Sequence, residues 1–180
     1  MAKEAGIIQH PLFIDYGQLS RNFEWVACRR ICRRFDLPTP VRIDVSGFGK
    51  TISAGITSRA MRLVEDAFLP SRNLLFVVLA GAFAYKLNAD GVCIGLLTER
   101  DHIFPDQTRH FLNSAQAILQ EAMDCDIKIV APLIELSKVE VLRLAAVKGI
   151  RSAYSCHRGL RRRCQKCISC REYLRATEKG

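Results

Sequence analysis

Apolar positions recur with two different periods along the chain, and these periods predict alternating strands and helices. Short apolar or alternating runs predict strands at 11–14, 41–45, 92–97 and 127–130. Apolar residues spaced four apart, such as Phe23, Ala27 and Ile31, predict a helix over 20–35. Further helices are predicted at 61–67, 74–87, 108–123 and 137–149, the last opened by a capping-box pattern from Ser137 to Glu140.

This alternation is typical of the α/β class, in which a Rossmann-like parallel sheet carries helices on both faces. Ligands of such sheets bind at the carboxyl ends of the strands, so the segments that follow the strands are candidate sites. We expect one α/β domain over residues 1–153 and a cysteine-rich helical tail over 154–180.

The composition indicates a globular protein and a positive net charge. Apolar residues make up 49% of the chain and charged residues 25%, which excludes a disordered or low-complexity protein. The longest apolar stretch, 74–85, is too short to span a bilayer, and the first residues carry no apolar signal segment. We therefore expect a cytoplasmic protein with no membrane partner. The net charge of +9 makes a polyanionic or phosphorylated partner worth testing.

Four of the eight cysteines form the strongest chemical signal, because Cys156, Cys164, Cys167 and Cys170 lie within 15 residues. Four thiolates this close complete a tetrahedral Zn²⁺ site without an open position, so the predicted metal is structural. An iron–sulfur cluster is the alternative, since the last three cysteines match the start of a ferredoxin motif. No Cys-Pro follows them, and ligand number and spacing favour Zn²⁺.

Six cations accompany these cysteines: Arg158, Arg161, Arg162, Arg163, Lys166 and Arg171. One interpretation is that they offset the formal charge of −2 that four thiolates and Zn²⁺ carry together. The other interpretation is a contact with nucleic acid. Charge compensation is the favoured interpretation, and nucleic acid is a partner that stays open.

Two further patterns are interpreted as structural. Cys28 and Cys32 lie one helical turn apart and are too few for a metal site, so we expect small buried apolar side chains. Residues 46–51 look like the end of a Walker A loop, but Asp44 stands where that motif requires glycine. We therefore expect a polar loop over this segment.

Chemistry-bearing residues also stand at strand ends and helix starts. Asp15 and its neighbours follow the first predicted strand, and a charged segment over 98–106 follows the strand at 92–97. Arg72 stands at a predicted helix start, where free N–H groups attract anions. Lys138 stands at another helix start, where a cation opposes the helix dipole, and such a departure hints at function.

Taken in order, these segments resemble 7-cyano-7-deazaguanine synthases. The resemblance covers about residues 11–170. It rests on Phe13-Ile14-Asp15-Tyr16-Gly17-Gln18, Pro70-Ser71-Arg72-Asn73, Ile94-Gly95, Phe104-Pro105-Asp106, Ala131-Pro132-Leu133 with Lys138, and Ser155-Cys156 with the other three cysteines. It implies an adenine nucleotide alpha hydrolase-like fold of the PP-loop ATP pyrophosphatase group. It also implies Zn²⁺ on the four cysteines and ATP with Mg²⁺ as co-substrate.

The activity that this resemblance implies is an ATP-dependent carbon–nitrogen ligation. The family converts 7-carboxy-7-deazaguanine and ammonia to 7-cyano-7-deazaguanine in queuosine biosynthesis. Negative charge that develops in such a reaction needs cations and N–H groups, which Arg72 and Lys138 would help to supply. Dimers are common in the resembling family, so a second copy is a partner to test. The implied binding residues, none of them assigned as catalytic, are Asp15, Tyr16, Gly17, Gln18, Arg72, Asn73, Asp101, Asp106 and Lys138.

The sequence departs from that family at two places. The PP-loop pattern Ser-Gly-Gly-x-Asp-Ser is absent, and Gln107-Thr108 follows Asp106 where the family has Cys-Arg. We expect the 1–153 domain to lack its first strand and PP-loop, through a truncated start or a rearranged sheet, so that strands near residues 12 and 92 lack a neighbour. Two alternatives to an active synthase stay open: a PP-loop-type tRNA-modifying enzyme, and a catalytically inactive, metal-stapled binding protein.

Overall fold

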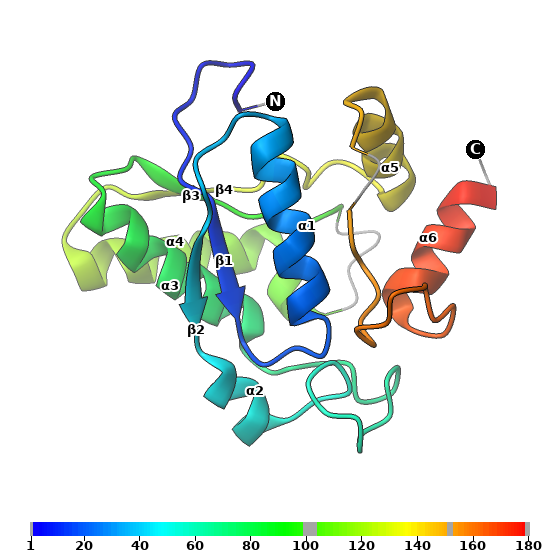
Figure 1. Ribbon diagram of the computed structural model, residues 1–180. Helices are drawn as coiled ribbons and strands as arrows, with labels where there is room; N and C mark the ends of the chain where they lie inside the picture. Colours follow the sequence, from blue (N-terminus) through cyan, green and yellow to red (C-terminus); the bar gives the residue numbers. More distant parts are fainter. Residues whose placement is uncertain (1, 99–103, 151–152, 179–180) are drawn as a thin grey trace. The chain divides into compact units, whose positions relative to one another are not determined.

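The computed structural model describes residues 2–98, 104–150 and 153–178, with side chains up to residue 175. The chain divides into two compact units. Figure 1 shows the helices and strands, coloured along the sequence from blue to red. Unit 1 comprises residues 1–69 and 145–180, and unit 2 comprises residues 70–144. The expected tail over 154–180 therefore groups with the first 69 residues, while the division at residue 153 stays a prediction.

Unit 1 is built around two parallel strands, β1 (Leu12–Asp15) and β2 (Val41–Asp44). Parallel strands need a crossover, and α1 (Arg21–Arg34) supplies it. Ala27 and Cys32 are buried on one face of α1, which confirms the predicted helix and the apolar role of Cys32. Cys28 is half-buried.

Two local predictions in unit 1 are wrong. Residues 46–52 form a short helix, α2 (Ser46–Ile52), rather than a polar loop. The Asp44 carboxylate accepts a hydrogen bond from the Ser46 N–H at 2.9 Å, and this turn starts the helix. Residues 61–67 form turns instead of a helix, although the two buried residues there, Leu63 and Ala67, are spaced four positions apart.

Unit 2 contains the second pair of parallel strands, β3 (Gly91–Cys93) and β4 (Lys128–Val130). Its helices are α3 (Arg72–Lys86), the short η2 (Pro105–Gln107), α4 (Arg109–Met123) and the start of α5 (Lys138–Val147). The Thr108 hydroxyl caps α4 by accepting from the Phe111 N–H at 3.1 Å. The helices predicted at 74–87, 108–123 and 137–149 are confirmed.

One core joins these elements, because Val77 and Ala84 of α3 pack with Ala115 and Leu119 of α4 and with Val92 of β3. The uninterrupted apolar stretch 74–85 predicts a buried helix, and this prediction is only partly correct. Val78 is 42% and Tyr85 55% exposed, so α3 buries one face only. β3 is also shorter than the predicted strand at 92–97.

The strands form two separate two-stranded sheets, β1–β2 and β3–β4. The α/β class with small parallel sheets is therefore confirmed. Within the described residues, β1 and β3 each pair along one edge only. The chain ends in α6 (Ile168–Glu178), which belongs to unit 1. Across the described ranges, every helix is too short or too polar to cross a membrane.

Candidate functional site

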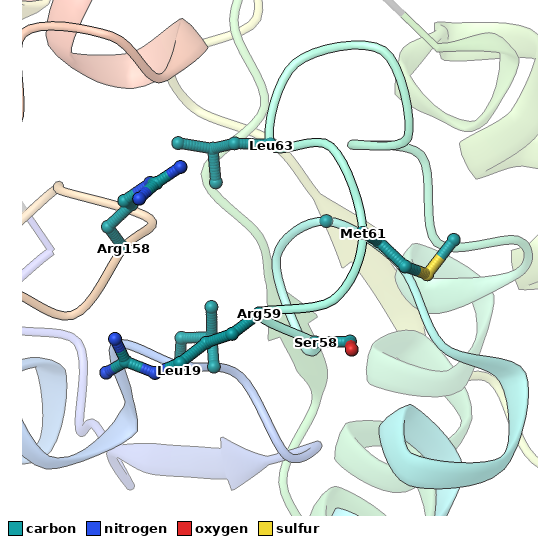
Figure 2. A pocket seen from close by; sticks show the side chains of 7 residues that line it. Leu19, Ser58, Arg59, Met61, Leu63 and Arg158 are labelled. Atoms are coloured by element: carbon teal, nitrogen blue, oxygen red, sulfur yellow. The ribbon is translucent and has the colours of Figure 1, made fainter.

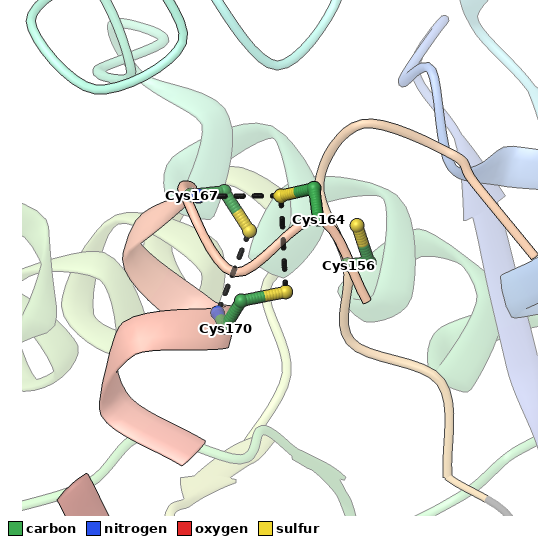
Figure 3. Close-up of side chains that lie close together, drawn as sticks. All are labelled: Cys156, Cys164, Cys167 and Cys170. Carbon is green, nitrogen blue, oxygen red and sulfur yellow. Dashed lines mark hydrogen bonds between the residues drawn. The ribbon is translucent and has the colours of Figure 1, made fainter. Parts of the chain in front are cut away.

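The four predicted metal ligands come together at one point of unit 1 (Figure 3). The Sγ atoms of Cys156, Cys164, Cys167 and Cys170 all lie within 4.8 Å of one another. A tetrahedral ion with Zn–S bonds of about 2.3 Å places its sulfurs about 3.8 Å apart. The Cys164 and Cys170 sulfurs are 3.9 Å apart. The cluster therefore fits a metal ion such as Zn²⁺ with all four positions occupied by thiolates.

The local backbone is arranged to favour thiolates. The Cys167 N–H donates to the Cys164 sulfur at 3.3 Å, and the Cys170 N–H donates to the Cys167 sulfur at 3.4 Å. This Cys-x-x-Cys-x-x-Cys turn leads directly into the first turn of α6. N–H groups directed at sulfur stabilise the negative charge that a metal-bound thiolate carries.

In the absence of a metal ion, burial disfavours the charged thiolates and favours the protonated thiols. Burial is the largest influence on Cys164, but the N–H groups of Cys167 and Lys166 outweigh it and lower its pKa to about 7. Burial raises the pKa of Cys167 to about 12 and also raises the pKa of Cys170. Metal binding at neutral pH therefore releases protons from this cluster.

Packing fixes the cluster against the rest of unit 1. Leu63 and Tyr154 contact the buried cysteines, and the Tyr154 ring stacks on Phe23 of α1 with centroids 5.0 Å apart. Burial is the main cause that raises the pKa of the Tyr154 phenol, whose hydroxyl donates to the Leu160 carbonyl at 2.8 Å. Gly159 has φ +64°, and a Cβ there would lie 2.1 Å from the Leu19 carbonyl oxygen. Only glycine permits this close approach.

The segment Asp15–Gln18 forms a self-contained polar turn at the carboxyl end of β1. The buried Asp15 carboxylate forms an ion pair with Arg42 and accepts from the Gly17 N–H at 3.0 Å. The buried Gln18 side chain accepts from the Tyr16 N–H at 3.0 Å and donates to Glu24 at 3.0 Å. The structure therefore uses the polar atoms of Asp15 and Gln18 to hold this turn.

Helix α2 supports the same turn from its other side. The Gly49 N–H donates to the Tyr16 carbonyl at 3.1 Å. Gly17 has φ +86°, and a Cβ there would lie 2.8 Å from the Ser46 carbonyl oxygen. The Walker-like segment thus has a structural function, which is to lie against the residues that follow β1.

A second group of predicted residues meets in unit 2. The Asn73 N–H donates to the Asp106 carboxylate at 3.3 Å, and the Asn73 side-chain amide donates to the Asp106 carbonyl at 3.0 Å. Arg72 lies beside them with its guanidinium 5.8 Å from the Phe76 ring centroid. The start of α3 is therefore tied to η2. Asp101 lies outside the described residues.

Lys138 begins α5 in unit 2, as predicted, and is half-buried. The capping box beside it is confirmed, because the Ser137 N–H and hydroxyl both donate to the Glu140 carboxylate at 2.7 Å. These two hydrogen bonds, the hydroxyl first, lower the pKa of Glu140. Within unit 1 the predicted residues form one group after β1 and one at the cysteines. Within unit 2, Asn73 and Asp106 meet at the start of α3, and Lys138 stands at the start of α5.

A small pocket in unit 1 was not predicted (Figure 2). It has a volume of about 60 Å³, and its lining includes Leu19, Ser58, Arg59, Met61, Leu63 and Arg158. Figure 2 shows Arg158 at the upper left of the view and the Arg59 guanidinium at the lower left, beside Leu19. Arg42, the partner of Asp15, was also missed. The sequence feature that could have indicated Arg42 is its position in the predicted strand 41–45, where polar and apolar residues alternate.

Comparison with known proteins agrees with these features. A family model described as queuosine biosynthesis protein QueC matches residues 1–179. The chain is 30% identical to a 7-cyano-7-deazaguanine synthase of Campylobacter concisus, over 100% of this chain and 87% of the relative. It is 27% identical to the synthase of Aliarcobacter butzleri, over 100% and 84%. It is 29% identical to the synthase of Methanobrevibacter smithii, over 93% of this chain and 81% of the relative.

The family model covers nearly the whole chain, and proteins named 7-cyano-7-deazaguanine synthase align along almost the same length. The chain therefore belongs to the queuosine biosynthesis protein QueC family.

Proposed function

We propose that this protein converts 7-carboxy-7-deazaguanine and ammonia to 7-cyano-7-deazaguanine in queuosine biosynthesis, as an ATP-dependent carbon–nitrogen ligase in the cytoplasm. The observation that carries this proposal is the family match over residues 1–179, together with relatives named for that product. The finer expectation of a single Rossmann-like sheet with helices on both faces belongs to the same proposal.

The chemistry sets clear demands on the site. Ammonia must replace a carboxylate oxygen to give an amide, and loss of a second water must then give the nitrile. A carboxylate is a poor electrophile, so the reaction requires an activating group, which ATP would supply, to make its oxygen a leaving group. Negative charge develops on oxygen in both steps, and fixed cations and N–H groups stabilise it.

Unit 2 provides groups of this type. Arg72 and Asn73 stand at the start of α3, and Lys138 stands at the start of α5. The two hydrogen bonds between Asn73 and Asp106 hold η2 at the start of α3. We assign Arg72 and Lys138 to binding of the anionic substrate, and Asn73 and Asp106 to positioning. Asp15 and Gln18 shape the turn after β1 in unit 1.

The residues fit a metal ion and do not fit the nucleotide in the same degree. The 180-residue sequence contains no Ser-Gly-Gly-x-Asp-Ser segment, so its residues do not fit the triphosphate of ATP in the manner of the family. At the metal cluster, four thiols fill a tetrahedral coordination sphere, so a bound Zn²⁺ stiffens the tail and leaves no position for substrate.

The test is product formation by the purified chain. The protein is incubated with 7-carboxy-7-deazaguanine, ammonium, ATP and Mg²⁺, and the nitrile and the amide are quantified by liquid chromatography and mass spectrometry. Calorimetric titration with ATP is measured in parallel. Nitrile formation supports the proposal. Absence of nitrile, amide and ATP binding in a zinc-loaded protein contradicts it and favours the inactive, metal-stapled homologue.

A variant pair tests the positioning role. Asn73→Ala removes the side-chain donor to Asp106 and is expected to reduce the rate of nitrile formation at least about tenfold. Asn113→Ala makes the same change on an exposed position of α4 and is expected to leave the rate within about twofold. Equal rates for the two variants would show that Asn73 has no such role.

A further inference from the structure

The excess positive charge of this protein is confined to one of its two units. Unit 1 carries 20 Lys and Arg residues against nine Asp and Glu residues, a formal net charge of +11. Unit 2 carries seven against nine, a net charge of −2. The net charge of +9 therefore conceals a strongly basic unit and a weakly acidic one. Fifteen of the 20 cations in unit 1 are arginines.

The cations of unit 1 are concentrated on two segments. On α1, Arg29, Arg30 and Arg33 are exposed on the face opposite the buried Ala27 and Cys32. On the cysteine-rich tail, all members of a second group are exposed: Arg158, Arg161, Arg162, Lys166 and Arg171. These eight residues define the basic surface. Arg163 is excluded from it, because its guanidinium donates to Ser155 and lies 3.5 Å from the Tyr173 ring centroid.

Two contacts join the tail to the start of α1 within unit 1. Phe23 near the start of α1 stacks on Tyr154 of the tail with an interplanar angle of 11°. Gly159 lies against the Leu19 carbonyl just before α1. The pocket of about 60 Å³ between Arg59 and Arg158 lies at the same junction. Arg59 and Arg158 both line this pocket, and an arginine side chain binds a phosphate group through two parallel N–H donors.

Charge compensation at the metal cluster does not account for this surface. Four thiolates with Zn²⁺ carry a formal charge of −2, while the cations between residues 158 and 171 number six. Four positive charges remain on the tail even after full compensation. The three arginines on α1 belong to a different element. Acidic side chains that would neutralise the cations of the tail are scarce, since residues 145–180 contain only Glu172 and Glu178.

We propose that the basic surface of unit 1 binds the sugar–phosphate backbone of a nucleic acid, with one phosphate seated between Arg59 and Arg158. Arginine predominates over lysine, which suits phosphate recognition and stacking on bases. A helix that binds a membrane surface needs a broad exposed apolar face. The exposed large apolar residues of α1 are Phe23 and Val26, which do not form such a face. The proposal does not rest on the ligase reaction.

The test is binding to labelled oligonucleotides, measured by fluorescence anisotropy over a range of KCl concentrations. The probes are an RNA hairpin, a single-stranded RNA and a DNA duplex of equal length. Phosphatidylserine vesicles and polyglutamate serve as the competing anionic classes. Six phosphate contacts on a duplex give a slope of about −5 for log affinity against log salt concentration. We expect such a slope for at least one nucleic acid, and the probes decide between RNA and DNA.

Two triple variants assign the binding to the surface. R29Q/R30Q/R33Q and R158Q/R161Q/R162Q are each expected to weaken binding more than about tenfold near 0.1 M salt and to reduce the slope by about 2 to 3. The matched control K86Q/K128Q/R143Q removes three cations from unit 2 and is expected to change affinity less than about twofold. Zinc content and circular dichroism verify that each variant is folded.

Several results would overturn the proposal. Absence of salt-dependent binding to all three oligonucleotides would do so, as would an equal loss of affinity in the unit 2 control. Binding to the vesicles or to polyglutamate that matches or exceeds binding to every oligonucleotide would show that the surface is not a nucleic-acid site. Loss in the tail variant alone, accompanied by loss of zinc, would assign the effect to misfolding and not to phosphate contacts.

Discussion

Replacement of Arg42 by methionine isolates the buried ion pair that holds the turn after β1. Asp15 is 1% exposed, and its carboxylate has the Arg42 guanidinium and the Gly17 N–H as partners. The Arg42 side chain is 37% exposed and lies over the Trp25 ring. Methionine provides an unbranched apolar side chain but removes the charge, so Asp15 is left buried without its cation.

The expected cost follows from how far the pair is buried. Removal of one partner from a fully buried pair costs about 3–5 kcal/mol, because an uncompensated charge remains. Exposed pairs are worth about 0–1 kcal/mol. Since Arg42 is partly exposed, we expect Arg42→Met to lower the free energy of unfolding of unit 1 by about 2–3 kcal/mol. Asp15→Asn is expected to cost less, because Arg42 can then turn towards water.

Urea denaturation followed by fluorescence measures this effect, because Trp25 is the only tryptophan and lies in unit 1. A loss of 2–3 kcal/mol lowers the midpoint by about 1–2 M urea. Arg62→Met, which breaks the more exposed Arg62–Asp66 pair, is the matched control and should cost less than about 0.5 kcal/mol. A double variant of Asp15 and Arg42 should lose less than the sum. If Arg42→Met behaves like Arg62→Met, the reasoning is refuted.

Three further predictions concern other parts of the chain. Gly159→Ala should destabilise the tail by about 1–3 kcal/mol, because φ is +64° and a backbone oxygen lies where the Cβ would be. Protection of the tail amides from hydrogen exchange should fall, and unchanged protection would contradict this prediction. The Glu140 carboxyl should titrate below its usual 4.5 by NMR, so its stabilisation of α5 is present above pH 4.5 and lost as pH falls through the lowered pKa; Ser137→Ala should move the midpoint back up. Burial and the neighbouring Cys32 raise the pKa of Cys28 to about 11, so iodoacetamide near pH 8 should alkylate it roughly 100-fold more slowly than an ordinary thiol; equal rates would contradict the structure.

Local patterns in the sequence predicted the parts of this structure that depend on local spacing. The four cysteines need only a short turn to converge, so Cys164, Cys167 and Cys170 were recognisable from their intervals. The repeat through Ala27 predicted α1 for the same reason. α2 was missed because its glycines disfavour a helix, which the Asp44 turn and the hydrogen bond to Tyr16 stabilise instead.

Contacts between distant segments could not be predicted in this way. The pair between Asp15 and Arg42 depends on the register of β1 against β2, in which Phe13 lies opposite Arg42. The contact of Asn73 with Asp106 joins residues 33 positions apart. Both Asn73 and Asp106 were candidates from the sequence, but nothing in their local surroundings indicated that they bind each other.

Metal analysis of the purified chain tests most directly whether the four cysteines clamp the tail. Zinc, iron and sulfide are quantified for the unaltered protein, for Cys167→Ser and for the control Cys93→Ser, which alters an exposed cysteine outside the cluster. We predict one zinc per chain, retained in Cys93→Ser and lost in Cys167→Ser together with protection of the tail. A chain that holds no zinc, or that holds iron with inorganic sulfide, would contradict the structural zinc site on which this account depends.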